Sequence, residues 1–113
     1  MSAEHLISVS LSEHRSTLVV AVVGELDIAS APQLTDELRD VNWREFERVV
    51  FDLSKVDFMD SSGLGALIAL RNSHSETDIS IVSESDGLVT KVLRLTAMEE
   101  LFSVYPSTEA ALA

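Results

Sequence analysis

An aspartate, two serines and two glycines form a compact group, Asp60-Ser61-Ser62-Gly63-Leu64-Gly65. The apolar run at residues 49–53 precedes this group and indicates a buried strand. The apolar spacing of Leu64, Leu67 and Ile68 after it predicts a helix. At such a strand–helix junction a serine hydroxyl can act as a nucleophile, help to bind a phosphate, or accept a phosphoryl group.

The first two kinds of chemistry lack their usual partners. The chain has no G-x-S-x-G elbow, and no histidine is obviously placed to activate a serine. The glycine pair lacks the lysine of a P-loop.

A purely structural role remains open, in which Asp60 caps the helix and the glycines fit a tight turn. Two glycines cost a helix about 1 kcal/mol each relative to alanine, so we expect the close approach of a neighbouring strand or of a partner's backbone to compensate.

Alternating and apolar segments predict an α/β fold around this junction. From residue 18 onward strands and helices alternate, which favours parallel pairing, and an initial hairpin with its turn at 13–16 makes the sheet mixed. Trp43 and Phe46 should pack over the end of the core. The expected strands are 6–12, 18–23 (ended by Gly24), 48–53, 79–82 and 101–105. The expected helices begin at Ser30 (with Gln33 in a capping box and an apolar stripe to Val41), Asp60, Ser85 or Asp86, and Ser107.

This topology brings distant polar residues together. The carboxyl ends of parallel strands share one edge of a sheet, where ligands of open α/β sheets usually bind. The segment after the second strand contains Glu25 and Asp27, and the segment after the third ends at Asp60 and Ser61. We therefore expect these four residues to lie on one surface.

Composition narrows the class of protein. The chain has 113 residues, 46% hydrophobic and 24% charged, which fits one globular domain over residues 1–113. The absence of cysteine excludes disulfides and thiol chemistry. A net charge of −11 disfavours nucleic acid and anionic membrane surfaces and suits a partner with a basic face.

Neither a targeting segment nor a metal site is expected. The first five residues lack a signal peptide's basic start, and no apolar run approaches the roughly 20 residues of a membrane span, so we expect a cytoplasmic protein. The histidines His5, His14 and His74 have no ligand spacing and are expected at the surface. The carboxylates form no calcium loop, so no metal and no cofactor is expected.

The segment Phe58-Met59-Asp60-Ser61-Ser62-Gly63-Leu64-Gly65 resembles the signature of bacterial anti-sigma-factor antagonists, the proteins that define the STAS domain. Gly24-Glu25-Leu26-Asp27 resembles that family's other short signature. The two motifs occur in the expected order, and the resemblance covers residues 6–105. One departure is Ala97, which follows Leu95-Thr96 where many members have glycine; it affects a turn and not the motifs.

The resemblance implies a mixed sheet of four or five strands with helices packed mainly on one side. It implies that Ser61 is phosphorylated by a partner that is both an anti-sigma factor and an ATP-dependent serine kinase. The unphosphorylated protein would bind that partner and so free a sigma factor, and a serine phosphatase would reset it. The expected partner-binding residues are Glu25, Asp27, Asp60, Ser62, Gly63, Leu64 and Gly65, with no catalytic residue.

The physical chemistry of the junction agrees with such a switch. A phosphate adds about −1.5 to −2 charge, which free amides and the dipole of a helix N-terminus tolerate, so the fold should survive modification. A partner interface beside Asp60 should not survive it. Two other functions stay open: a STAS scaffold in another signalling or transporter complex, and a nucleotide-binding or hydrolytic protein that uses the same helix N-terminus.

Overall fold

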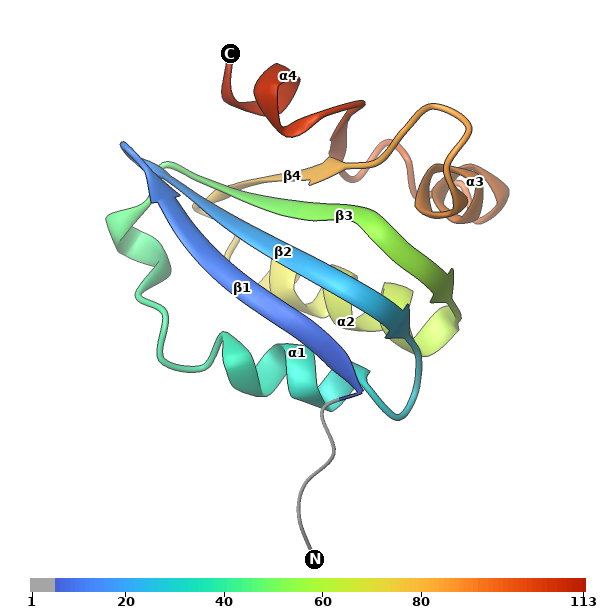
Figure 1. The fold of residues 1–113 in the computed structure, drawn as a ribbon. Helices are drawn as coiled ribbons and strands as arrows, with labels where there is room; N and C mark the ends of the chain where they lie inside the picture. The colour runs from blue at the N-terminus through green and yellow to red at the C-terminus, as the bar shows by residue number, and fades with distance from the viewer. Residues whose placement is uncertain (1–5) are drawn as a thin grey trace, which may run out of the picture.

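A computed structural model describes residues 6–113, which form a five-stranded sheet with the strand order β1-β2-β3-β4-β5 (Figure 1). The strands β1 and β2 pair antiparallel and the other neighbours pair parallel, so the predicted mixed α/β sheet is confirmed. The expectations for the leader segment and for His5 concern residues outside this range. The elements are β1 (Ile7–His14), β2 (Thr17–Leu26), α1 (Ala31–Glu37), the 3₁₀ helix η1 (Trp43–Glu45), β3 (Arg48–Met59), α2 (Ser61–Ser73), β4 (Asp78–Val82), α3 (Leu88–Leu95), β5 (Ser103–Tyr105) and α4 (Thr108–Leu112).

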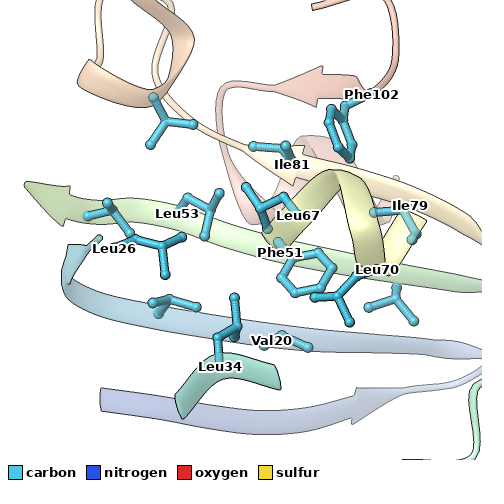
Figure 2. Packing of buried hydrophobic residues seen from close by; sticks show 14 of the residues in the cluster. Val20, Leu26, Leu34, Phe51, Leu53, Leu67, Leu70, Ile79, Ile81 and Phe102 are labelled. Atoms are coloured by element: carbon cyan, nitrogen blue, oxygen red, sulfur yellow. The ribbon is translucent and has the colours of Figure 1, made fainter. Parts of the chain in front are cut away.

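The sheet has one fully covered face and one that is covered only in part. The main core lies on the face that packs against α1, α2 and α3, with Phe51 of β3 at its centre (Figure 2). The short helix α4 packs on the opposite face, where Ala111 contacts a small second cluster. Helices therefore pack mainly on one side, as predicted. Successive residues of β2 and β3 belong in turn to one cluster and then the other, because successive side chains of a strand point to opposite faces.

The two central strands are longer than their apolar runs predict. Pairing of β2 with β3 continues to Leu26↔Met59, beyond the expected ends at residues 23 and 53. Gly24 does not end β2; it lies inside the strand with φ 119° and pairs with both neighbours. Two register shifts let β3 include extra residues while β2 keeps its alternation. The predicted ends of the two strands were wrong because hydrogen bonding to neighbouring strands keeps polar residues in a strand, although their sequence shows no strand pattern.

Helix ends were predicted with mixed success. Ser107 caps α4, and its hydroxyl oxygen accepts a bond from the Ala110 amide at 3.1 Å, as expected. The expected caps Ser85 and Asp86 are wrong, because Gly87 precedes α3. The helix α1 is shorter than its apolar stripe, which continued to Val41, and β5 begins at residue 103 and not at 101.

Trp43 and Phe46 pack at the end of the core, as predicted. Trp43 is buried, and its ring stacks on the His74 ring with 3.9 Å between centroids and 7° between planes. His74 is therefore half-buried and not simply a surface residue, and its burial lowers its pKa below the ordinary value of 6.5. Within residues 6–113, no helix is long and apolar enough to cross a bilayer.

Candidate functional site

The start of α2 is capped by Asp60, as the sequence predicts. One carboxylate oxygen, Oδ1, accepts hydrogen bonds from the amides of Ser62 at 2.8 Å and Gly63 at 3.0 Å. These bonds satisfy two of the amides that a helix start leaves unpaired. The expectation that free amides face a phosphate here must be corrected, because the Asp60 carboxylate already occupies two of them.

Ser61 is the first residue of α2, and it is exposed. Ser62, one residue further into the first turn, is half-buried and gives its amide to the Asp60 cap. Of the two hydroxyls, the one on Ser61 is therefore the more accessible to an enzyme that approaches from solvent.

The two glycines of this helix have different surroundings. A Cβ added to Gly63 would lie only 2.2 Å from the carbonyl oxygen of Leu26, so α2 touches the end of β2 at this point. Nothing lies within 4 Å of a Cβ added to Gly65. The sequence left open whether a neighbouring strand or a partner approaches these glycines. The strand accounts for Gly63, which is buried, as is Leu64, whereas Gly65 is exposed.

The segments after β2 and β3 meet at one edge of the sheet, as predicted. Glu25 pairs with Phe58, Leu26 pairs with Met59, and the Asp60 amide donates to the Leu26 carbonyl oxygen at 3.4 Å. The topology thus joins the two short motifs, which are separated in the sequence, into one structural unit.

The loop between β2 and α1 is fixed by reciprocal bonds between Asp27 and Ser30. The Asp27 carboxylate accepts from the amides of Ala29 and Ser30, both at 3.0 Å. The buried Ser30 hydroxyl accepts from the Asp27 amide at 2.9 Å and donates to the Glu25 carbonyl oxygen at 2.6 Å. The side chain of Asp27 therefore holds the loop, while Glu25 is the more exposed carboxylate.

The predicted capping box at the start of α1 is wrong. Ser30 makes no side-chain cap bond, because its hydroxyl is used within the loop. Gln33 instead accepts from the amides of Leu6 and Ile7 and donates to the Ile7 carbonyl oxygen at 2.8 Å. Ser30 binds the backbone of residues before the helix, and Gln33 binds the backbone of β1. The spacing of the two residues in the sequence does not reveal either partner.

Sequence reasoning missed two exposed apolar side chains at this edge. Ile28, in the β2–α1 loop, is 74% exposed, and Phe58, near the end of β3, is 44% exposed. The only available signal was that each is a large apolar residue directly after an aspartate, at a predicted loop position. Around them lie the carboxylates of Glu25, Asp57 and Asp60, and within residues 6–113 no three potential ligands gather as a metal site.

Comparison with known proteins identifies the family. The model of the STAS domain matches residues 8–111. The anti-sigma-F factor antagonist RsfB of Mycobacterium tuberculosis is 26% identical over 112 residues, covering 99% of this chain and 92% of RsfB. An anti-sigma factor antagonist from Mycobacterium paratuberculosis, solved as a crystal structure, is 31% identical with a TM-score of 0.84, covering 99% of this chain and 96% of that one.

A more distant structure shares the fold. The Bacillus cell fate determinant SpoIIAA in its phosphorylated form has a TM-score of 0.63 at 19% identity, covering 93% of this chain and 96% of SpoIIAA. The family match, the similar sequences and the strand order all point to the same family as the two short motifs at residues 24–27 and 58–65. The chain belongs to the STAS-domain family of anti-sigma-factor antagonists.

Proposed function

We propose that this protein frees a sigma factor by binding its anti-sigma factor, and that phosphorylation of Ser61 switches the binding off. The anti-sigma factor is also the serine kinase and holds the ATP, and a serine phosphatase restores the unphosphorylated form. The chain itself is a regulatory binding protein without catalytic activity, and it works in the cytoplasm.

The observation that carries this proposal is the placement of Ser61. Its exposed position at the first residue of α2 leaves it accessible, while the Asp60 cap and the contact of Gly63 with Leu26 hold the helix start in place. The Ser61 hydroxyl is therefore accessible to a kinase at the start of a well-held helix, and no loop has to refold to expose it.

The electrostatics favour a switch that acts at the surface. Because Asp60 occupies the amides of Ser62 and Gly63, a phosphate on Ser61 lies beside a carboxylate and gains little from the capped helix start. The dianion stays in water in the free protein but would be desolvated and repelled in a complex. Mismatched charge at an interface costs several kcal/mol, which corresponds to a loss of affinity of roughly a hundredfold or more.

The relatives support the same assignment. RsfB is named for antagonism of an anti-sigma-F factor, and SpoIIAA, which shares this fold, has been solved with its phosphate in place. By analogy the partner of this chain is an anti-sigma factor. The contact is bordered by four residues, Glu25, Asp60, Ser62 and Gly65. Three further residues hold these in place, Asp27, Gly63 and Leu64.

The test uses purified anti-sigma factors from the source organism. Each is incubated with the chain and ATP, the phosphorylated residue is mapped by mass spectrometry, and affinity is measured by calorimetry before and after labelling. We expect phosphate on Ser61 and a Kd that rises about a hundredfold or more on labelling.

Three variants sharpen this experiment. Ser61→Ala should bind without being labelled, and Ser61→Asp should bind more weakly. Ser75→Asp is the matched control, because it adds the same charge to an exposed serine beyond the far end of α2, about 20 Å away. Labelling at Ser62 alone, or equal affinity before and after labelling at Ser61, would contradict the proposal.

A further inference from the structure

The partly covered face of the sheet is apolar at both ends, but only one end is protected. At one end α4 packs on Val19, Val50 and Val82, which are at most 5% exposed. Toward the carboxyl ends of β2 and β3, no helix within residues 6–113 covers this face. Val23 and Phe58 there are each 44% exposed.

The exposed side chains lie together on that face. Residues that pair in a sheet point to the same side, and Val23 pairs with Lys55 while Glu25 pairs with Phe58. Because Val22 and Leu26 are buried on the other face, Val23 and Glu25 share the uncovered one, about 7 Å apart. Leu6, which is 47% exposed, directly precedes the Ile7–Gly24 pair beside them.

Ile28 is a further exposed apolar residue, in the loop that follows β2 at this same end of the sheet. It lies two residues beyond Leu26, and the bonds between Asp27 and Ser30 fix the loop that presents it. A large apolar side chain held 74% exposed on a rigid loop gains nothing from the fold itself. Such preordered apolar side chains are typical anchors of protein interfaces, since little entropy is lost when they bind.

Charge indicates which kind of partner fits. Glu25 pairs with Phe58, Asp57 and Asp60 lie within two residues of Phe58 along the chain, and Lys55 pairs with Val23. The whole chain has a net charge of −11. Self-association would bring acidic rims together, which like-charge repulsion opposes. The complementary surface is an apolar pocket with a basic rim on a different protein.

From these observations we propose that Leu6, Val23, Phe58 and Ile28, which we call the apolar strip, form the main anchoring part of the surface that binds the anti-sigma factor. The proposal rests on the proposed function and extends the contact from the start of α2 onto the uncovered face of the sheet. Ser61 then lies at the margin of the contact, where a phosphate is readily added, while the apolar strip supplies affinity.

The test measures the affinity of alanine variants for the purified anti-sigma factor that binds the wild-type chain in the experiment above. Ile28→Ala and Phe58→Ala should each raise the Kd about tenfold or more, as anchor residues do. Leu11→Ala is the matched control. Leu11 is 45% exposed and pairs with the core residue Val20, so it points to the opposite face of the sheet from Val23, about 10 Å further along the strands. Its Kd should stay within about twofold of wild type.

The outcomes separate this inference from the proposed function. Ile28→Ala is decisive because so exposed a side chain contributes little to folding, whereas the stability of Phe58→Ala, in which the wild-type side chain is 44% exposed, is checked by its melting curve. If Ile28→Ala and Phe58→Ala bind like Leu11→Ala while Ser61→Asp still binds weakly, the apolar strip is not the anchor and the phosphorylation switch stands. If the wild-type chain binds no anti-sigma factor, both proposals fail.

Discussion

Replacing the two glycines of α2 by alanine, one at a time, should change stability in opposite directions. Both residues lie in the same helix, two positions apart, and neither has a positive φ. Alanine is favoured over glycine in a helix by up to about 1 kcal/mol. At Gly65 nothing opposes that gain, because the added Cβ meets open space, so Gly65→Ala should stabilise the protein by about 0.5–1 kcal/mol.

At Gly63 the same methyl group meets a backbone that cannot easily move. The contact with the Leu26 carbonyl oxygen must lengthen from 2.2 Å to at least 3.0 Å, and the carbonyl carbon lies at 2.9 Å. That displacement strains the 3.4 Å bond from the Asp60 amide to the same oxygen. Overpacking of this kind costs about 1–3 kcal/mol, and more where backbone is displaced, so Gly63→Ala should be destabilised by about 2 kcal/mol after the helix gain is subtracted.

Urea unfolding followed by circular dichroism measures both variants against the wild type, with melting curves as a second readout. The melting temperature should change by about 4 °C for each kcal/mol in a domain of this size. A Gly63→Ala variant as stable as the wild type, or one more stable than Gly65→Ala, would refute the packing argument. Gly65→Ala carries a further result: a stable variant that binds the anti-sigma factor weakly would indicate that the partner's backbone approaches there.

Two further substitutions test the elements around the site. Ser30→Ala should lower the free energy of unfolding by about 1–3 kcal/mol in urea, because it leaves the Asp27 amide and the Glu25 carbonyl oxygen without their buried partner; an unchanged midpoint would contradict this. Burial lowers the pKa of His74 below 6.5, so the unfolded chain binds its proton more tightly. The resulting stability is complete above about pH 6.5 and is lost as the pH falls toward the folded-state pKa. His74→Phe keeps an aromatic ring against Trp43 without a proton, so urea unfolding at about pH 7.5 and 5.5 should show a smaller loss for the variant than for wild type.

The sequence predicted those features that depend on local chemistry. The cap at Asp60 follows from residue type and position, and so does the cap at Ser107. The meeting of the segments around Leu26 and Met59 followed from the alternation of strands and helices, which restricts topology strongly. In each case a short-range pattern or a general rule of chain connection was sufficient.

The features that escaped prediction depend on partners distant in sequence. Gln33 has the right spacing for a capping box but binds the backbone of Ile7, and this pairing exists only after α1 packs beside β1. The close approach at Gly63 depends on Leu26, and the exposure of Phe58 depends on where α4 ends its cover of the sheet. No pattern within α2 or β3 contains that information.

The same distant contacts explain why one residue can control binding without changing the fold. The lack of a side chain at Gly63 lets the start of α2 contact the Leu26 backbone closely. Leu26 is followed directly by the loop that the hydrogen bonds between Asp27 and Ser30 hold in place. Ser61 is therefore carried by a junction with little freedom to rearrange. Since Asp60 already binds the amides of Ser62 and Gly63, these two amides cannot bind a phosphate, and the added charge is met mainly by solvent or by the binding protein. A comparison of NMR spectra should then show shifts confined to this edge on phosphorylation, and shifts throughout the core would contradict a switch that acts by surface charge.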